Sequence, residues 1–99
     1  MDTLRTHGVS ACSGRMEAGT TAVHTQLEAT VAAFLGKEDA MVVGMGFATN
    51  SAVIPVVVDH AGEGGGVLVV SDALNHASIV EGVRASGAKV QPFAHNDVA

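Results

Sequence analysis

The stretch that decides the fold runs from residue 67 to residue 93 and reads VLVVSDALNHASIVEGVRASGAKVQPF. It opens with a wholly apolar run, Val67 to Val70, which predicts a strand buried on both faces. A turn is expected over residues 71–75, then a helix over residues 77–85 that Gly87 closes, and a further strand from Lys89 to Phe93. A strand, a helix and a strand in this order predict parallel pairing across a crossover helix.

The residues before this stretch continue the same alternation. Residues 40–43 (AMVV) predict another short buried strand, and residues 44–46 (GMG) predict a tight turn. A helix is expected from Phe47 to about Val57, and it should kink or end near Pro55, because proline lacks a backbone donor. Residues 59–66 are polar and rich in glycine, which predicts a loop.

A further helix is expected to begin at Thr20 or Thr21, either of which can cap it. Its apolar side chains recur at helical spacing, and Gly36 stands where a helix end favours a residue with positive φ. The apolar positions are Val23, Leu27, Val31, Phe34 and Leu35. Residues 1–20 show no clean period and predict loop and turn. The fold class is therefore α/β, with a loop segment over 1–20 and an incomplete part of a larger domain, mostly parallel sheet with flanking helices, over 21–99.

Composition narrows the kinds of partner. The formal net charge is −5 with only five Lys and Arg, which argues against nucleic acid, since phosphate backbones are bound by clustered positive charge. Cys12 is the single cysteine, so no disulfide can form within the chain. The longest apolar run, Ala52 to Val58, is too short to span a bilayer, so any membrane association should come from elsewhere in a longer chain.

Residues 44–50 (GMGFATN) follow one predicted strand and open a helix. They resemble a dinucleotide fingerprint only in part, because Thr49 stands where the last glycine belongs. Glycines allow a ligand to approach the backbone, and free amides at a helix start favour an anion. A tight strand-to-helix turn without any ligand explains the same residues equally well.

Residues 72–78 (DALNHAS) place several polar side chains after the next predicted strand. The carboxyl ends of parallel strands share one edge of a sheet, where ligands collect, so this segment and residues 44–50 should lie close together. A catalytic triad from Ser, His and Asp lacks the usual nucleophile elbow, and a metal shared by Asp72 and His76 lacks further ligands at suitable spacing. A flat imidazole can also stack on a flat ring. The simplest alternative is that Asp72 and Ser78 are turn and helix-cap residues.

Three more polar positions stay open between function and structure. Arg15 can bind a carboxylate or a phosphate through its fork of donors, or form a structural salt bridge. His24 should lie in the first turn of its helix. Residues 95–97 (HND) follow the last predicted strand and form either an edge of the same cleft or a simple turn.

Taken together, these motifs resemble the α-oxoamine synthases, a family of fold-type I enzymes that depend on pyridoxal 5'-phosphate. The resemblance runs from about Gly8 to Asp97, and several ordered motifs at matching separations make it specific. Its strongest stretches are residues 19–28 (GTTAVHTQLE), 44–51 (GMGFATNS) and 71–82 (SDALNHASIVEG). It implies a place in the aspartate aminotransferase-like large domain, with residues 21–99 as part of the cofactor-binding domain.

The resemblance also implies roles for individual residues. The backbone of Gly46 and Phe47 would bind the cofactor phosphate, and Asn50 would lie in the same pocket. His76 would be the catalytic histidine, stacking on the pyridine ring and orienting the amino acid for loss of its α-proton. The reaction would be a decarboxylative condensation of L-serine with palmitoyl-CoA, giving 3-ketosphinganine, CoA and CO2. The closest branch of the family works as a dimer of subunits of the same fold on the cytosolic face of the endoplasmic reticulum membrane.

The family's Schiff-base lysine, its aspartate for the pyridine nitrogen and a second histidine all lie further along the chain. Lys37 and Lys89 do not stand in the lysine motif, so residues 1–99 alone are predicted to be inactive. Three alternatives remain: another synthase of the family, such as one that makes 5-aminolevulinate; a non-catalytic partner subunit of the same fold; and a plain α/β domain that binds a phosphorylated metabolite.

Overall fold

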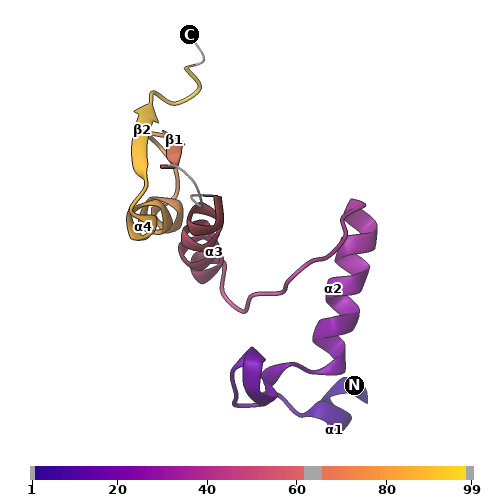
Figure 1. Cartoon of the computed structure of the whole chain (residues 1–99). Helices are drawn as coiled ribbons and strands as arrows, with labels where there is room; N and C mark the ends of the chain where they lie inside the picture. Colours follow the sequence, from indigo (N-terminus) through magenta and orange to yellow (C-terminus); the bar gives the residue numbers. More distant parts are fainter. Residues whose placement is uncertain (1, 62–65, 98–99) are drawn as a thin grey trace. The chain divides into compact units, whose positions relative to one another are not determined.

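The computed structural model describes residues 2–61 and 66–97. The chain consists of two compact units, and the boundary between them lies after Val42 (Figure 1). The first unit, residues 1–42, holds α1 (Asp2–His7), a π-helical turn η1 (Arg15–Gly19) and α2 (Ala22–Leu35). The second unit, residues 43–99, holds α3 (Gly46–Ala61), β1 (Leu68–Asp72), α4 (Ala77–Ser86) and β2 (Lys89–Phe93).

The two strands of the second unit pair in parallel, as the sequence predicts. Leu68 lies opposite Lys89, and the register continues to Asp72 opposite Phe93. Helix α4 connects the strands and ends at Gly87, whose φ of 67° is a left-handed conformation that glycine adopts without a steric cost. The carboxyl ends of both strands therefore lie at one edge. At this edge β1 runs directly into the turn that leads to α4.

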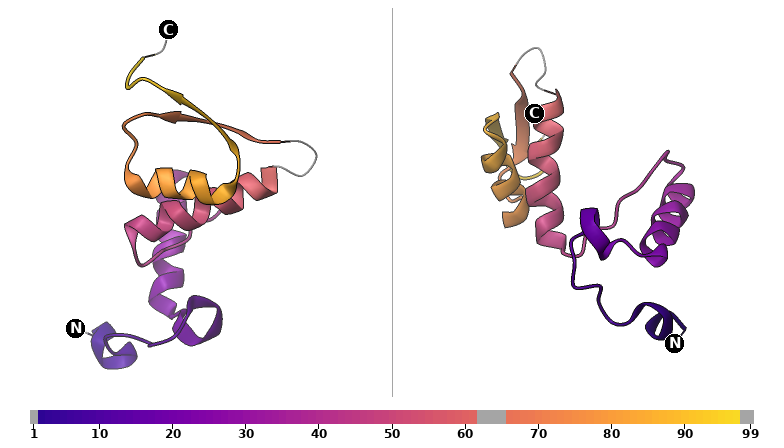
Figure 2. Two further views of the ribbon diagram at one scale, coloured as in Figure 1. Left: turned by 90° about the vertical axis from the view of Figure 1, so that its left-hand side faces the viewer. Right: turned by 60° about the horizontal axis from the view of Figure 1, so that its bottom comes forward.

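Helices α3 and α4 lie side by side (Figure 2). Their close approach depends on Gly82, because a Cβ at this position would stand 2.6 Å from the carbonyl oxygen of Asn50 and 3.1 Å from the Ile54 side chain. Helix α3 also continues beyond Pro55 to Ala61, so the expectation that it ends near Pro55 is wrong. The φ of proline suits a helix, and packing of this helix against α4 outweighs the single missing backbone hydrogen bond. Part of the expected loop 59–66 is thus helical, and its residues 62–65 lie outside the described residues.

Helix α2 of the first unit confirms its predicted boundaries. Thr21 is the N-cap, and its backbone N–H donates to Nδ1 of His24 at 3.2 Å. At the other end, Gly36 adopts a φ of 63°, and its N–H donates to the carbonyl of Ala33. This arrangement is the left-handed end that a glycine after an apolar helix predicts.

Residues 1–20 are not loop throughout, because α1 and η1 lie within them. The hydroxyl of Thr6 donates to the carbonyl of Asp2 at 3.0 Å, and the Gly8 N–H donates to the carbonyl of Leu4 at the end of α1. In η1 the Gly19 N–H reaches back to the carbonyl of Gly14 at 2.9 Å. Both segments are short and held by local polar bonds, so they carry no apolar period from which the sequence could predict them.

The strand expected over residues 40–43 is absent from the described part of the chain, and this prediction is wrong. Both backbone groups of Val42 bind side chains instead: its N–H donates to Oε1 of Glu28 at 2.8 Å, and its carbonyl accepts from Nη1 of Arg15 at 3.0 Å. A strand needs a neighbouring strand for its backbone groups. At Val42 a carboxylate and a guanidinium take that place.

Candidate cofactor site

The two segments predicted to share an edge of the sheet do meet. Phe47 lies in the first turn of α3, and His76 is the N-cap of α4. Their ring centroids are 6.4 Å apart and the ring planes are inclined by 70°, an edge-to-face arrangement that aromatic rings favour. The start of α3 and the start of α4 therefore form one rim of the second unit.

The start of α3 carries the features of an anion site. The first backbone N–H groups of a helix have no carbonyl acceptor within it, and the helix dipole adds positive potential there. Gly46 opens the helix, and a Cβ built on it would meet no described atom within 4 Å. Neither a positive φ nor a protein neighbour requires glycine at this position. The space in front of it can therefore admit a ligand to the backbone.

A chain of hydrogen bonds joins Asn50, Ser78 and His76. Nδ2 of Asn50 donates to Oγ of Ser78 at 2.9 Å, and this Oγ lies 2.7 Å from Nδ1 of His76. The backbone N–H of Ser78 also donates to the same Nδ1 at 3.1 Å, which caps α4. Three of the four predicted site residues, Phe47, Asn50 and His76, are thus brought together, and Gly46 is the chain neighbour of Phe47.

Sequence reasoning missed the part that Ser78 plays here. The sequence suggested Ser78 as a helix cap, but His76 is the capping residue. Ser78 lies 28 residues from Asn50, and no periodic pattern marks such a pair. The one local signal for the contact between Ser78 and His76 was a histidine two residues before a serine at a predicted helix start.

The contact between Ser78 and His76 is not that of a nucleophile and its base. Ser78 is 1% exposed, so a substrate cannot reach its hydroxyl. Asp72, which a triad would need behind the histidine, binds elsewhere: its Oδ2 lies 3.0 Å from Nδ1 of His95. Among the described residues no group of three potential ligands could hold a metal ion.

Asp72 is instead a turn residue at the end of β1. Its Oδ1 accepts the backbone N–H of Leu74 at 2.7 Å, which is the turn role the sequence suggested. This bond, followed by the bond from His95, lowers the pKa of the Asp72 carboxyl below its ordinary 3.8, although desolvation acts in the opposite direction. The segment 95–97 therefore folds back onto the strand ends through His95.

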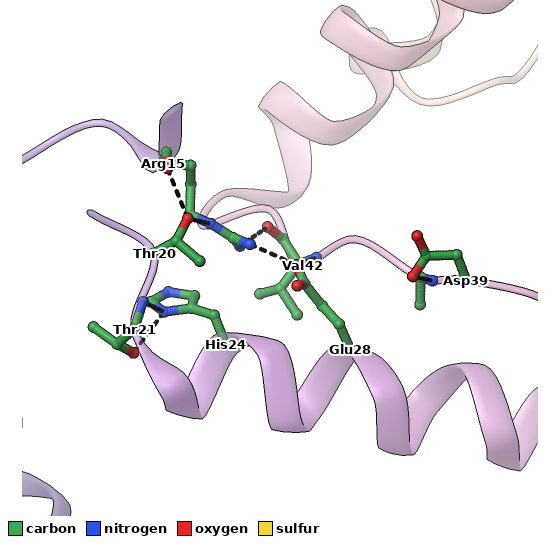
Figure 3. A network of polar contacts seen from close by, with 8 residues as sticks. Arg15, Thr20, Thr21, His24, Glu28, Asp39 and Val42 are labelled. Carbon is green, nitrogen blue, oxygen red and sulfur yellow. Dashed lines mark hydrogen bonds and ion pairs between the residues drawn. The ribbon is translucent and has the colours of Figure 1, made fainter. Parts of the chain in front are cut away.

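Arg15 is a structural ion-pair residue of the first unit (Figure 3). Its Nη2 lies 2.7 Å from Oε1 of Glu28, its Nη1 binds the Val42 carbonyl, and its Nε donates to Oγ1 of Thr20 at 2.9 Å. The Val42 N–H and then the Arg15 guanidinium lower the pKa of Glu28 below its ordinary 4.5. Each of the three guanidinium nitrogens binds a protein group, which favours the structural alternative for Arg15. His24 lies in the first turn of α2, as expected.

A separate hollow of about 480 Å³ lies between α4 and the strand pair. Its lining includes Ser71, Val80, Val83, Val90 and Pro92, and neither Phe47 nor His76 contributes to it. The rim formed by α3 and α4 is therefore distinct from this hollow.

Parallel α/β units bind ligands beyond the carboxyl ends of their strands, and the free amides at a helix start can hold a phosphate. The chain belongs to the aminotransferase class I and II family, whose model matches residues 2–99. This membership confirms the α/β, fold-type I class predicted from the sequence.

Within this family the chain is similar to proteins of long chain base biosynthesis and to serine palmitoyltransferases. The chain is 52% identical over 96 residues to the long chain base biosynthesis protein 2a of Arabidopsis thaliana, covering 97% of this chain and 19% of that protein. It is 50% identical to the human serine palmitoyltransferase 3, covering 97% of this chain and 16% of that protein. The chain thus spans less than a fifth of the length of these curated relatives.

Solved structures agree with the relatives. A serine palmitoyltransferase from S. paucimobilis, with a bound PLP–myriocin aldimine, is 31% identical with a TM-score of 0.85, covering 98% of this chain and 24% of that one. The serine palmitoyltransferase of Sphingomonas wittichii is 30% identical, also at 0.85, with 98% and 23% covered. No helix in the described ranges 2–61 and 66–97 has the length and apolar character needed to cross a membrane.

Proposed function

We propose that residues 1–99 form part of the cofactor-binding domain of a serine palmitoyltransferase that depends on pyridoxal 5'-phosphate. The whole enzyme condenses L-serine with palmitoyl-CoA and releases 3-ketosphinganine, CoA and CO2. The observation that carries the proposal is the contact between Phe47 and His76, in a chain about half identical to proteins of that name. When bound, the cofactor supplies the electron sink that the condensation needs.

The residues present fit the cofactor's phosphate at the start of α3. The amides of Gly46 and Phe47 belong to the first turn and have no acceptor within the helix. The open space in front of Gly46 allows a phosphate to approach them, and the helix dipole favours its negative charge. The net negative charge of the chain does not oppose this, because the donors are backbone groups.

His76 provides the flat face for the pyridine ring. Its position as N-cap of α4 fixes the backbone, and the neighbouring Phe47 ring, inclined by 70°, limits how the imidazole can tilt. A ring held in this way orients the amino acid substrate for removal of its α-proton. Asn50 lies in the same site and acts within the hydrogen bonds behind His76.

Residues 1–99 by themselves should not catalyse the reaction. Lys89 opens β2 opposite Leu68, whereas His76 follows the other end of β1. Four strand steps of about 3.3 Å separate the two ends by roughly 13 Å. Lys37 follows the glycine that ends α2 and donates its backbone N–H to the carbonyl of Ala32. The longer protein would supply the lysine that holds the cofactor. It would also pair with a subunit of the same fold and attach to the endoplasmic reticulum membrane at the cytosolic face.

A chimaera tests the proposal. Residues 2–99 replace the matching fifth of the Arabidopsis relative, and product formation is measured with palmitoyl-CoA and either serine, glycine or alanine. We expect 3-ketosphinganine from serine, and a loss of about a hundredfold in His76→Ala, in line with removal of a group that orients proton transfer. His60→Ala, at the exposed end of α3, is the matched control and should keep full activity.

Two results would contradict the proposal. A chimaera that binds the cofactor but prefers glycine would assign the chain to another synthase of the family. Equal activity of His76→Ala and His60→Ala would remove His76 from the site.

A further inference from the structure

We propose that Ser78 is a positioning residue that fixes which ring nitrogen of His76 carries the proton, and that Asn50 sets the direction of the Ser78 hydroxyl. The His76 ring then has a bare Nδ1 and a protonated Nε2. The structural part of this inference stands on hydrogen bonds alone. Its catalytic consequence rests on the proposed function.

The bond from the Ser78 backbone decides the state of Nδ1. An amide N–H can only donate, so an Nδ1 that receives it at 3.1 Å must offer a lone pair. A neutral imidazole with a bare Nδ1 carries its proton on Nε2. The backbone N–H of Ser78 therefore favours the tautomer of His76 with a bare Nδ1, whatever the rotamer of the Ser78 side chain.

The hydroxyl of Ser78 adds a second donor to the same nitrogen. Oγ lies 2.7 Å from Nδ1, and it also receives Nδ2 of Asn50 at 2.9 Å. Because the Asn50 NH2 group can only donate, the lone pair of Oγ faces Asn50 and its hydrogen points to Nδ1. Ser78 is 1% exposed, so water cannot replace either bond. The order of donation thus runs in one direction, from Asn50 through Ser78 to His76.

Two donors on one nitrogen also hold the ring plane. A single bond would let the imidazole turn about its Cβ–Cγ axis, whereas an N–H and an O–H that reach Nδ1 from different directions restrict it. Nε2 makes no hydrogen bond among the described residues, so the ring is anchored on the Nδ1 side only. This arrangement presents the His76 face in one orientation beside Phe47.

A purely structural role would link α3 to α4 through the same atoms, so the variants must separate the two explanations. Asn50→Asp keeps an oxygen within reach of Ser78 but reverses the bond, because a carboxylate accepts the hydroxyl hydrogen. Asn50→Ala removes the bond altogether. A structural link predicts that Asn50→Asp is the milder change. Control of the tautomer predicts that Asn50→Asp is at least as severe as Asn50→Ala, since it turns the Ser78 hydrogen away from Nδ1.

The experiment measures imidazole 15N shifts by solid-state NMR in the cofactor-free chimaera, with His76 assigned by its absence from His76→Gln. The native protein should show one species, with Nδ1 bare and Nε2 protonated. Ser78→Ala and Asn50→Asp should each lower the tautomer ratio by about fivefold to tenfold, the effect of one hydrogen bond. In the loaded chimaera both should lower kcat by about tenfold with a smaller change in KM for serine. Ser51→Ala is the control, because its hydroxyl only donates to helix carbonyls such as that of Phe47.

A protonated Nδ1 in the native protein would overturn the inference, and so would a milder effect of Asn50→Asp than of Asn50→Ala on the tautomer ratio. The 15N measurement needs neither cofactor nor turnover. A chimaera that shows the expected tautomers but makes no 3-ketosphinganine would therefore refute the proposed function and leave this inference standing.

Discussion

The two units of the chain are held together by different forces. In the second unit, α4 packs against α3 across Gly82, and Val83 and Ser78 are buried. In the first unit Ala32 is the one buried apolar side chain that the structure describes, and Phe34 on the same helix is 87% exposed. There a polar cluster around Arg15 ties the chain together. Val83 is likewise the one buried apolar side chain described in the second unit, and Leu68 and Val70 of β1 are 59% and 62% exposed. The units therefore differ in close helix packing against a polar cluster, and in neither do the apolar runs of the sequence predict burial.

The largest effect is expected from a methyl group added between α3 and α4. Gly82→Ala would place a Cβ 2.6 Å from the Asn50 carbonyl oxygen, which is backbone and cannot rotate away. The helices must separate, and such overpacking costs about 1–3 kcal/mol. Urea unfolding of the chain followed by far-UV circular dichroism should show a lower midpoint.

Gly66→Ala is the matched control, because its added Cβ would meet no described atom within 4 Å. A midpoint as high in Gly82→Ala as in Gly66→Ala would show that the second unit does not depend on close helix packing. The two units would then no longer differ in what stabilises them.

The next largest effect concerns the polar cluster of the first unit. Arg15→Lys keeps the charge but cannot reach Glu28, Val42 and Thr20 at once, because an ammonium lacks the planar fork. We expect faster amide hydrogen exchange at Val42 and a smaller fall in the unfolding midpoint than for Gly82→Ala.

Arg84→Lys in the second unit provides the comparison for this variant. Arg84 reaches Glu81 at 3.4 Å, and its side chain is 75% exposed. Such surface pairs contribute little to stability, so this substitution should leave the midpoint unchanged. Equal effects of the two substitutions would mean that the fork of Arg15 adds nothing beyond its charge.

The sequence predicted most of the second unit, because its signals are local. The apolar run Val67–Val70, which overlaps β1, and the glycine after α4 mark those elements within a few residues. The same holds for α2 between Thr21 and Gly36. The contact of Phe47 with His76 was predicted, but from a strand over residues 40–43 that is absent from the described chain; packing of α3 against α4 brings the two residues together instead.

The remaining features depend on partners that a local pattern does not contain. Residues 40–43 have the composition of a strand, but Glu28 and Arg15 bind the backbone of Val42 where a strand would. The link from Asn50 to Ser78 needs α3 and α4 in place before either side chain has a partner. The extension of α3 beyond Pro55 is likewise decided by tertiary packing, which outweighs the local preference.

A smaller effect should appear as a pH dependence of the first unit. The Val42 N–H and the Arg15 guanidinium lower the pKa of Glu28, so the folded state binds this proton less readily than the unfolded state does. The stability it contributes is present above the ordinary pKa of 4.5 and is lost as the pH falls through the lower folded value. Unfolding midpoints from about pH 6 to about pH 3 should fall less steeply in Glu28→Gln than in the native chain. Glu38→Gln, at an exposed position, should retain the native slope.

The smallest effect is expected at the strand ends of the second unit, where the contact with His95 is only part of the reason for the lowered pKa of Asp72. The Leu74 N–H is the largest reason for the lowered pKa of Asp72, and His95 follows it. His95→Gln removes the imidazole but leaves the turn, so the Asp72 pKa, measured by 13C NMR of its carboxyl, should rise only part of the way to 3.8. A return to the full ordinary value would show that the imidazole, not the backbone, holds this carboxylate. In that case Asp72 would differ from Glu28 of the first unit, where the backbone N–H of Val42 lowers the carboxyl pKa more than the Arg15 side chain does.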